Sequence, residues 1–358
     1  MTSRHQSELA NFNIREIIDK LFTVLNERER EIVSRRHGLF NTPKATLEEI
    51  GKKHSVTRER VRQVENSSLK KIRENYDKEI LKNVEALTTE ILREYGGIMA
   101  EHRLVVELAQ NSGNTEESHA AVSFLLNQLL HDKFGLIKET DETYKSWSNI
   151  DASWETFYEN LNKIVKLIKE HEEPLALNLL ISKVNGQPEI SWNDVSDAFI
   201  LNLLDVTKKI DRNIYDEWGL SDWSTIKPRR MNDKIYMVLK KTGQPMHFAD
   251  IATAINKAHF DERVAYPATI HNELILDPKF VLVGRGIYAL SDWGYKPGVV
   301  ADVIAGILKA SAKPLTKEQI IEEVLKNRIV KKSTVILALM NKNRFVKNAD
   351  KTYSLKPA

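Results

Sequence analysis

Residues 46–73, TLEEIGKKHSVTRERVRQVENSSLKKIR, restrict the possible fold of this chain more than any other stretch. Thr46 and Glu49 stand three residues apart, the spacing at which a hydroxyl and a carboxylate cap the first amides of a helix reciprocally. The spacing predicts a short helix from Thr46, with Gly51 placed where a second helix can approach closely. After a break in the apolar pattern, Thr57 is the expected N-cap of a longer second helix.

The second helix has an apolar arc and a polar arc, because successive residues turn by about 100°. One arc can pack against the first helix and carries Val61, Val64, Ser68 and Ile72. The opposite arc carries Arg58, Glu59, Arg62, Gln63 and Asn66. Arginine can bind guanine through two hydrogen bonds, glutamine can bind adenine, and glutamate can accept from N4 of cytosine. The pattern predicts a helix-turn-helix that reads a major groove; the alternative is a solvated helix whose charges serve solubility alone.

Further predictions concern the residues on either side of this polar arc. Three cations follow it at positions that can meet DNA phosphates: Lys70, Lys71 and Arg73. The helix is expected to continue through Tyr76 towards Leu92 and to end at Gly96–Gly97. Upstream, residues 13–26 carry apolar side chains at helical spacing and predict an amphipathic helix that belongs to a core.

The same residues resemble the region 4 helix-turn-helix of housekeeping bacterial sigma factors, whose hallmarks are TLEEIG, VTRERVRQ and a basic LKKIR tail. The resemblance is nearly letter for letter over residues 46–73, extends more weakly through residues 25–39, and covers roughly the first fifth of the chain. It implies that Arg58, Glu59 and Gln63 contact bases of the minus-35 promoter element. Contacts to phosphates or neighbouring activators are implied for Thr57, Arg60 and Arg62. The resemblance also implies that the apolar face of the first helices binds the flap of the polymerase beta subunit.

In that family, an aromatic-rich helical domain that grips the polymerase and melts DNA precedes region 4. Only about twelve residues precede the first amphipathic helix here. The chain is therefore expected to read a promoter element without opening DNA by itself, unless its C-terminal part replaces that domain.

Length and composition limit the number of domains and the class of protein that can be expected. A chain of 358 residues predicts two or more domains, and 42% apolar with 29% charged residues is ordinary for a globular protein. The absence of cysteine excludes disulfides and thiolate metal sites. No apolar run of about 18 residues and no signal-peptide layout are present, so we expect a cytoplasmic, nucleoid-associated protein with no membrane partner.

Beyond residue 78, a unit of roughly 65 to 75 residues recurs along the chain. Each copy reads as three helices and two short strands around a turn, the pattern of a winged helix. The last copy shows it most clearly, with Thr316 and Ser333 as the expected caps of its second and third helices. The fold class expected is mainly α, a helix-turn-helix domain followed by tandem winged-helix units. The expected domains are residues 1–78, 79–150, 151–227, 228–297 and 298–358, although the second and third could instead be unrelated helical segments.

Residues 231–293 also resemble the HARE-type winged helix, which is known from the delta subunit of bacterial RNA polymerase and from some chromatin and restriction proteins. The resemblance rests on the run QPMHFADI, the helix start PATI and the ending FVLVGRGIYAL. It implies that residues 228–297 fold as a winged helix of that type.

Charge is unevenly distributed along the chain. Residues 1–80 hold 17 Lys and Arg against 13 Asp and Glu, and residues 298–358 hold 12 against 5. Residues 141–224 hold 8 against 16. Basic ends suggest nucleic-acid contact there, with the acidic middle as a spacer or protein-contact surface. Phosphate contacts are expected in the last unit from Lys331, Lys332 and Arg344.

The sequence contains no motif that supports a catalytic site. Residues 284–289 match G-x-G-x-x-A but lie between two expected strands, so a hairpin turn is favoured over a dinucleotide site. The ten histidines lack metal-ligand spacing, and His247 and His271 are expected to be structural. No nucleophile elbow or phosphate loop is present. We therefore expect no catalytic residues, no cofactor, no metal and no small-molecule substrate, and the chain is not expected to be an enzyme.

Two functional hypotheses follow. In the first, the chain is a DNA-binding transcription factor that acts with bacterial RNA polymerase, with double-stranded DNA as its other partner. In the second, it is a polymerase-associated adaptor, a delta-like accessory subunit or a competitor of sigma, with little sequence-specific DNA binding. A host-defence or restriction accessory, suggested only by where HARE-type domains occur, ranks last.

Overall fold

The computed structural model describes residues 13–75, 78–186, 196–295, 298–311 and 313–356. The chain is mainly helical and divides into two compact units, Met1–Asp211 and Arg212–Ala358, and each is described by itself. Within the described ranges, no helix is long and apolar enough to cross a membrane.

The first described helix, α2 (Ile14–Leu21), is capped by Asn13, whose side chain accepts from the amides of Arg15 and Glu16. A 3-10 turn (Phe22–Val24) follows, and α3 (Glu27–His37) begins at the N-cap Asn26. The predicted helix over residues 13–26 is therefore too long. It stops early because Leu25 is extended and Asn26 forms a capping box with Glu29 that starts the next helix.

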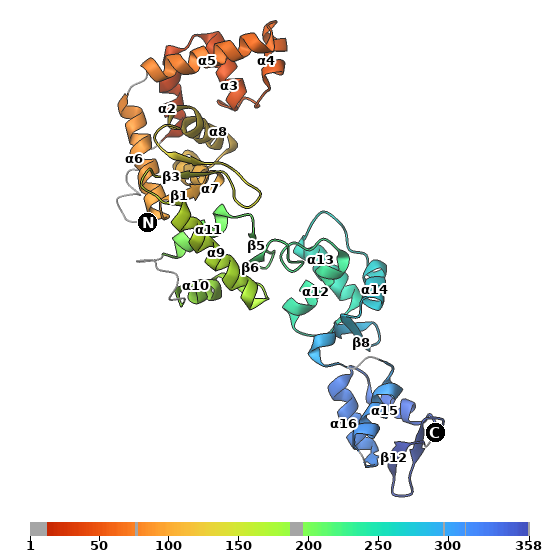
Figure 1. The fold of residues 1–358 in the computed structure, drawn as a ribbon. Helices are drawn as coiled ribbons and strands as arrows, with labels where there is room; N and C mark the ends of the chain where they lie inside the picture. The colour runs from red at the N-terminus through yellow and green to blue at the C-terminus, as the bar shows by residue number, and fades with distance from the viewer. Residues whose placement is uncertain (1–12, 76–77, 187–195, 296–297, 312, 357–358) are drawn as a thin grey trace. The chain divides into compact units, whose positions relative to one another are not determined.

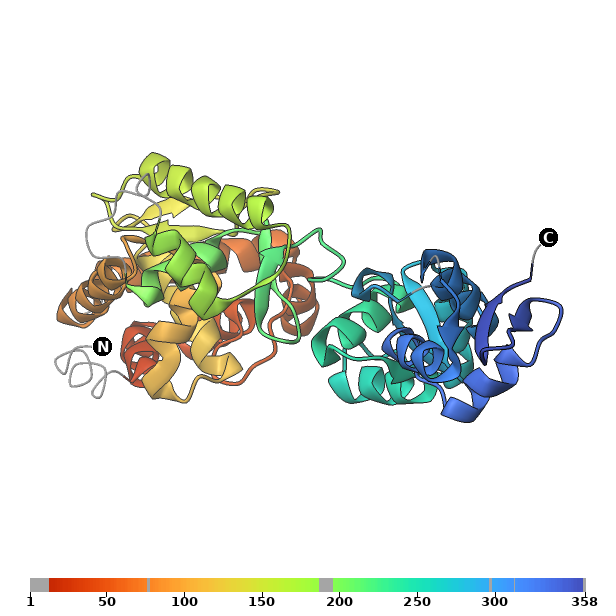
Figure 2. The same ribbon diagram turned by 90° about the horizontal axis from the view of Figure 1, so that it is seen from below.

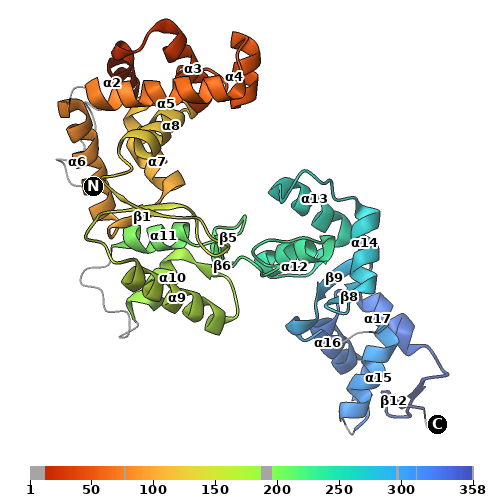
Figure 3. The ribbon, with the colours of Figure 1, turned by 45° about the horizontal axis from the view of Figure 1, so that its top comes forward.

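The helix-turn-helix is formed by α4 (Leu47–His54) and α5 (Arg58–Asn75), and Figure 3 shows α5 lying across α2, α3 and α4. The amide of Glu49 donates to Thr46 Oγ1 over 3.2 Å, and the amide of Thr46 donates to Glu49 Oε2 over 2.7 Å, so the predicted capping box is confirmed. Thr57 Oγ1 accepts from the amide of Arg60 at 3.2 Å, as expected of an N-cap. A Cβ on Gly51 would lie 2.7 Å from the carbonyl oxygen of Val56, so only glycine fits this close approach.

The predicted apolar arc of α5 divides between two cores. Val61 packs with Ile32 and Ile50, and Val64 lies against this cluster. Ile72 instead belongs to a second cluster built around α2, so its predicted contact with the first helix of the motif is wrong. The reason is length, because α5 extends about 27 Å and α4 only about 12 Å.

The expected continuous helix towards Leu92 is also corrected. α5 ends at Asn75, and α6 (Lys78–Glu94) runs in a different direction (Figures 1 and 3). Tyr76, through which the helix was expected to pass, lies outside the described residues. The end at Gly96–Gly97 is confirmed, since both glycines adopt positive φ values of 87° and 84°.

In the described residues after α5, the order helix, short strand, helix, helix and two strands occurs four times. The first set contains α6, β1 (Ile98–Ala100), α7 (Glu101–Ala109), α8 (Glu116–Phe124), a π-helical turn (Leu125–Leu129), β2 (Gly135–Ile137) and β3 (Ser146–Ser148). The second set contains α9 (Trp154–His171), β4 (Leu175–Ala176), α10 (Leu177–Asn185), α11 (Asp197–Val206), β5 (Ile210–Arg212) and β6 (Glu217–Leu220). In Figure 2, α9 is seen as one straight helix.

The third set contains α12 (Met231–Thr242), β7 (Met246–His247), α13 (Phe248–Ala258), α14 (Pro267–Leu276), β8 (Phe280–Gly284) and β9 (Ile287–Leu290). The fourth contains α15 (Val300–Ser311), β10 (Leu315–Thr316), α16 (Lys317–Asn327), α17 (Lys332–Leu339), β11 (Phe345–Lys347) and β12 (Thr352–Leu355). In the first, third and fourth sets, the strands form one antiparallel sheet with the last strand in the centre.

The capping predictions for the fourth set have different outcomes. Thr316 caps α16 through a capping box with Gln319, as expected. Ser333 is not a cap, because α17 already begins at Lys332 with Lys331 in the extended conformation at the N-cap.

Candidate nucleic-acid interface

The polar arc of α5 is open to solvent along its length. The predicted base-contacting residues Arg58, Glu59 and Gln63 are all exposed, as are Arg62 and Asn66. On the other side of the helix, the buried residues are Val61, Ser68, Leu69 and Ile72. The cores hold α5 by its apolar side, so its polar side is free to enter a groove.

Charges on this arc pair with one another. Arg62 donates to the Glu59 carboxylate from Nε and Nη2 over 2.9 and 2.7 Å, and these hydrogen bonds lower the pKa of Glu59. Glu59 is therefore an acceptor at neutral pH, as contact with cytosine N4 requires. Arg60 Nη1 donates to Gln63 Oε1 over 3.2 Å. Such exposed pairs contribute little to stability and can be exchanged for DNA contacts.

The three cations after the polar arc have different surroundings. Lys70 is exposed and lies 3.7 Å from Glu74. Lys71 Nζ lies 2.5 Å from Glu29 on α3. Arg73 donates from Nε and Nη2 to the carbonyl oxygen of Gln128, over 3.0 and 2.7 Å. Lys70 is thus the cation of this group best placed for a phosphate, while Lys71 and Arg73 hold α5 to its neighbours.

Arg73 and Lys70 are therefore expected to respond differently to alanine substitution. Arg73→Ala should lower the stability of the N-terminal unit by about 0.5–1.5 kcal/mol, because the exposed hydrogen bonds to the Gln128 carbonyl are lost. Lys70→Ala should leave stability unchanged and reduce the slope of log K against log salt for DNA binding by about 0.9, one phosphate contact. Thermal melts and salt titrations of both variants measure this. A reduced slope in Arg73→Ala with unchanged stability would show that Arg73 contacts phosphate instead.

The predicted phosphate-contacting residues of the last unit lie around α17. Lys331 and Lys332 are exposed at its start. Arg344 Nη1 forms an ion pair of 2.8 Å with Asp302 of α15, so part of its charge is already compensated.

The apolar face of α2 is buried by another helix of the same chain. Ile14, Ile18 and Leu21 are almost completely inaccessible. The ring of Phe124, on α8, lies edge-on to Phe22 with the centroids 5.8 Å apart. The resemblance assigns this face to the polymerase flap, but in this structure α8 covers it.

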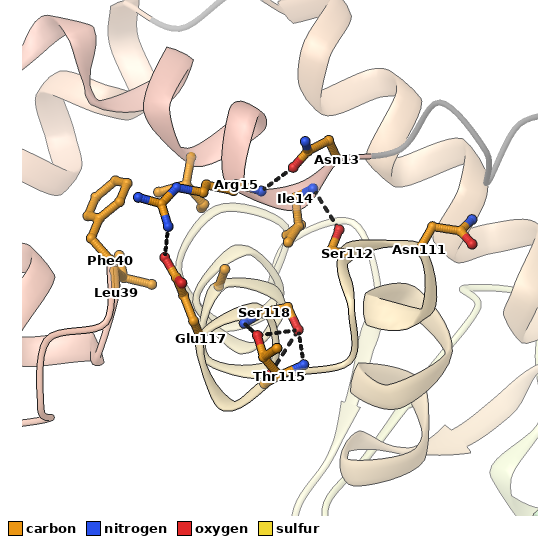
Figure 4. Close-up of a pocket in the computed structure, with 12 residues that line it drawn as sticks. Asn13, Ile14, Arg15, Leu39, Phe40, Asn111, Ser112, Thr115, Glu117 and Ser118 are labelled. Atoms are coloured by element: carbon orange, nitrogen blue, oxygen red, sulfur yellow. Dashed lines mark hydrogen bonds and ion pairs between the residues drawn. The ribbon is translucent and has the colours of Figure 1, made fainter.

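Polar contacts fix the same interface at its rim. Arg15 and Glu117 form an ion pair of 2.9 Å, and the amide of Ile14 donates to Ser112 Oγ over 3.0 Å (Figure 4). A cavity of about 290 Å³ remains between α2 and α8. Figure 4 shows that its polar rim is largely occupied by these contacts and by the capping box of Thr115 and Ser118. This interface joins residues about one hundred positions apart and was not predicted from the sequence.

The remaining sequence features have structural roles. Residues 284–289 cover the last residue of β8, the two-residue turn at 285–286 and the first three residues of β9, so they do not form a strand-to-helix turn. His247 Nδ1 accepts from the amide of Ala249 at the start of α13, and the His271 ring packs on Phe248 with the centroids 4.8 Å apart. Among the described residues, no group of three or more His, Asp or Glu side chains could hold a metal ion.

Comparison with known proteins shows that the N-terminal part of the chain is similar to one protein family. Residues 21–74 match the family described as Sigma-70, region 4. RNA polymerase sigma factor RpoD of Helicobacter pylori (strain ATCC 700392 / 26695) is 48% identical over 67 residues, 18% of this chain and 10% of that protein. RNA polymerase sigma factor SigA1 of Synechococcus elongatus is 40% identical over 77 residues, 22% of this chain and 19% of that protein. The chain thus spans a tenth to a fifth of the length of these relatives, and the resemblance of its N-terminal part to sigma region 4 is confirmed.

Proposed function

We propose that this chain is a DNA-binding transcription factor that acts with bacterial RNA polymerase and reads a minus-35-like element through α5. The observation that carries the proposal is the open polar arc of α5, inside the stretch that matches Sigma-70, region 4. Arg58, Glu59 and Gln63 are the base-contacting residues. Phosphate contacts come from Thr57, Arg60, Arg62 and Lys70, which are all exposed. The chain is a binding protein and not an enzyme.

The four repeated sets of helices and strands are proposed to be winged-helix units, the third of them of HARE type. The recurrence of one element order supports this assignment. The sheet arrangement shared by the first, third and fourth sets supports it as well. Within the described residues, the segments that follow the DNA-reading domain are these units and not further sigma-like segments.

Contact with the polymerase flap through the apolar face of α2 would require α8 to leave that face. Phe124 and Phe22 would then both be exposed, at a cost of about 1.5–3 kcal/mol per side chain, unless the flap replaced the lost contact. The polymerase flap and α8 would therefore compete for the apolar face of α2.

The alternative is an adaptor that joins RNA polymerase to another protein with little sequence-specific DNA binding. The acidic composition of residues 141–224, with 16 Asp and Glu against 8 Lys and Arg, favours protein over DNA as the partner of that segment.

Binding to two labelled duplexes distinguishes the two functions. One duplex carries a sigma-type minus-35 element and the other the same bases in shuffled order, and fluorescence anisotropy is followed from low to near-physiological salt. The transcription-factor proposal expects at least about tenfold preference for the first duplex, a difference of about 1.4 kcal/mol. Equal affinities, together with co-purification of polymerase after nuclease treatment, would establish the adaptor instead.

A further inference from the structure

The third helix of each repeated set has a different environment in the two compact units. In α8, no residue from Glu117 to Phe124 is exposed, because α2 covers the side that faces away from its own core. In α11, no residue from Ala198 to Val206 is exposed. The side-chain Nδ2 of Asn202 donates to the backbone carbonyls of Tyr95 and Ile98 over 2.8 and 2.6 Å, so the first set covers this helix. In the N-terminal unit, the third helix is therefore a packing surface for a neighbouring domain.

The corresponding helices of the C-terminal unit have an exposed side. On α14, Ile275 is 62% and Leu276 78% exposed. On α17, Leu337 is 70% exposed, and Met340, the C-cap that follows the helix, is 66% exposed. Each of these helices carries one Lys, Arg, Asp or Glu, namely Glu273 in α14 and Lys332 in α17. Apolar side chains cannot pair with the donors and acceptors of base edges. An exposed apolar stripe on a helix is instead typical of a protein-binding surface.

The exposed side of α17 has a defined shape and charge. Ser333, Leu337 and Met340 stand at steps of four and three residues, so they form one stripe along the helix. Lys331 and Lys332 begin the helix, and Lys342 follows its end, all exposed. The stripe is thus apolar in its centre and basic at both ends.

The chain itself shows what covers such a helix. The element packed on α8 is α2, an amphipathic helix whose buried Ile14, Ile18 and Leu21 follow the same steps of four and three residues. From this precedent and from the cations around α17, we propose that the stripe of Ser333, Leu337 and Met340 binds an amphipathic helix of another protein, with acidic residues beside its apolar stripe. None of these residues belongs to α5, so the proposal stands whether or not α5 reads DNA.

Three probes and the full chain test this proposal. The first is a synthetic helical peptide with Ile, Ile and Leu at steps of four and three residues and glutamates on its flanks. The second has the same stripe with lysine flanks, and the third is a random-sequence DNA duplex. We expect the acidic peptide to bind at least about tenfold more tightly than the basic one, by anisotropy. Failure of the acidic peptide to bind below millimolar concentration would overturn the proposal.

Variants locate the binding surface. Leu337→Asp with Met340→Asp should weaken the acidic peptide at least about tenfold, since the apolar stripe is then replaced by like charge. Both side chains are exposed, so circular dichroism and melting should match the parent chain. The matched control is Ile150→Asp, at an apolar side chain that is 82% exposed in the other unit, and it should bind the peptide normally. The proposal fails if the double variant binds as the parent does. It also fails if Lys331→Ala with Lys332→Ala weakens only the duplex, because the surface would then be a DNA contact.

Discussion

Replacement of Arg58 and Gln63 together by alanine is expected to abolish most of the sequence preference in DNA binding. Each bidentate base contact discriminates against the wrong base by about 1–3 kcal/mol, so two lost contacts should reduce affinity for the minus-35 duplex by about 2–6 kcal/mol. Both side chains are exposed. Alanine has the highest helix propensity, so α5 should keep its fold. Anisotropy titrations with the minus-35 and shuffled duplexes measure the change.

Lys52→Ala provides the matched control for that experiment. Lys52 lies on α4, is 77% exposed at its side chain, and has an exposed partner, Glu48, at 3.3 Å. Its removal takes away one positive charge, as Arg58→Ala does, but no group on the polar arc of α5. The control should therefore keep the ratio of the two affinities. A double variant that also keeps this ratio would show that α5 does not read bases.

The local elements of the helix-turn-helix could be predicted because the signals for them are local. The capping box of Thr46 and Glu49 and the cap at Thr57 each join residues three apart, and both are found as expected. The close approach at Gly51 is likewise set by the next few residues. Exposure of the polar arc then follows from helical periodicity alone.

Contacts between distant residues could not be predicted in the same way. Arg73 has the chemistry of a phosphate ligand and of a donor to a carbonyl, and only the fold shows that Gln128, 55 residues away, is its acceptor. The same holds for α2, whose apolar stripe predicts burial but not the helix that covers it. One signal was present in α8, where Ala121, Val122 and Phe124 are buried and Ala120 packs against the neighbouring core, so the helix is apolar on more than one side. A helix of this kind is packed on two sides, which points to a second domain.

Gly96→Ala is expected to destabilise the N-terminal unit strongly. Gly96 has φ +87°, and the left-handed conformation costs an alanine about 1–2 kcal/mol. A Cβ there would also lie 1.8 Å from Cε2 of Phe199 on α11, so the ring must move from its place against the first set. Such overpacking costs about 1–3 kcal/mol more, which gives a total of about 2–5 kcal/mol. Denaturant unfolding of the full chain, followed by tryptophan fluorescence, measures the change in free energy.

Gly113→Ala separates backbone strain from the steric clash, because this glycine lies in the same compact unit. Its φ is +85°, nearly that of Gly96, but a Cβ there would meet only Cγ2 of Thr115 at an ordinary 3.7 Å. It should therefore lose about 1–2 kcal/mol, the cost of the conformation alone. The difference between the two variants measures how firmly α11 is held against the first set. Equal losses would mean that the Phe199 ring moves away freely, and that the enclosure of α11 is looser than the hydrogen bonds from Asn202 imply.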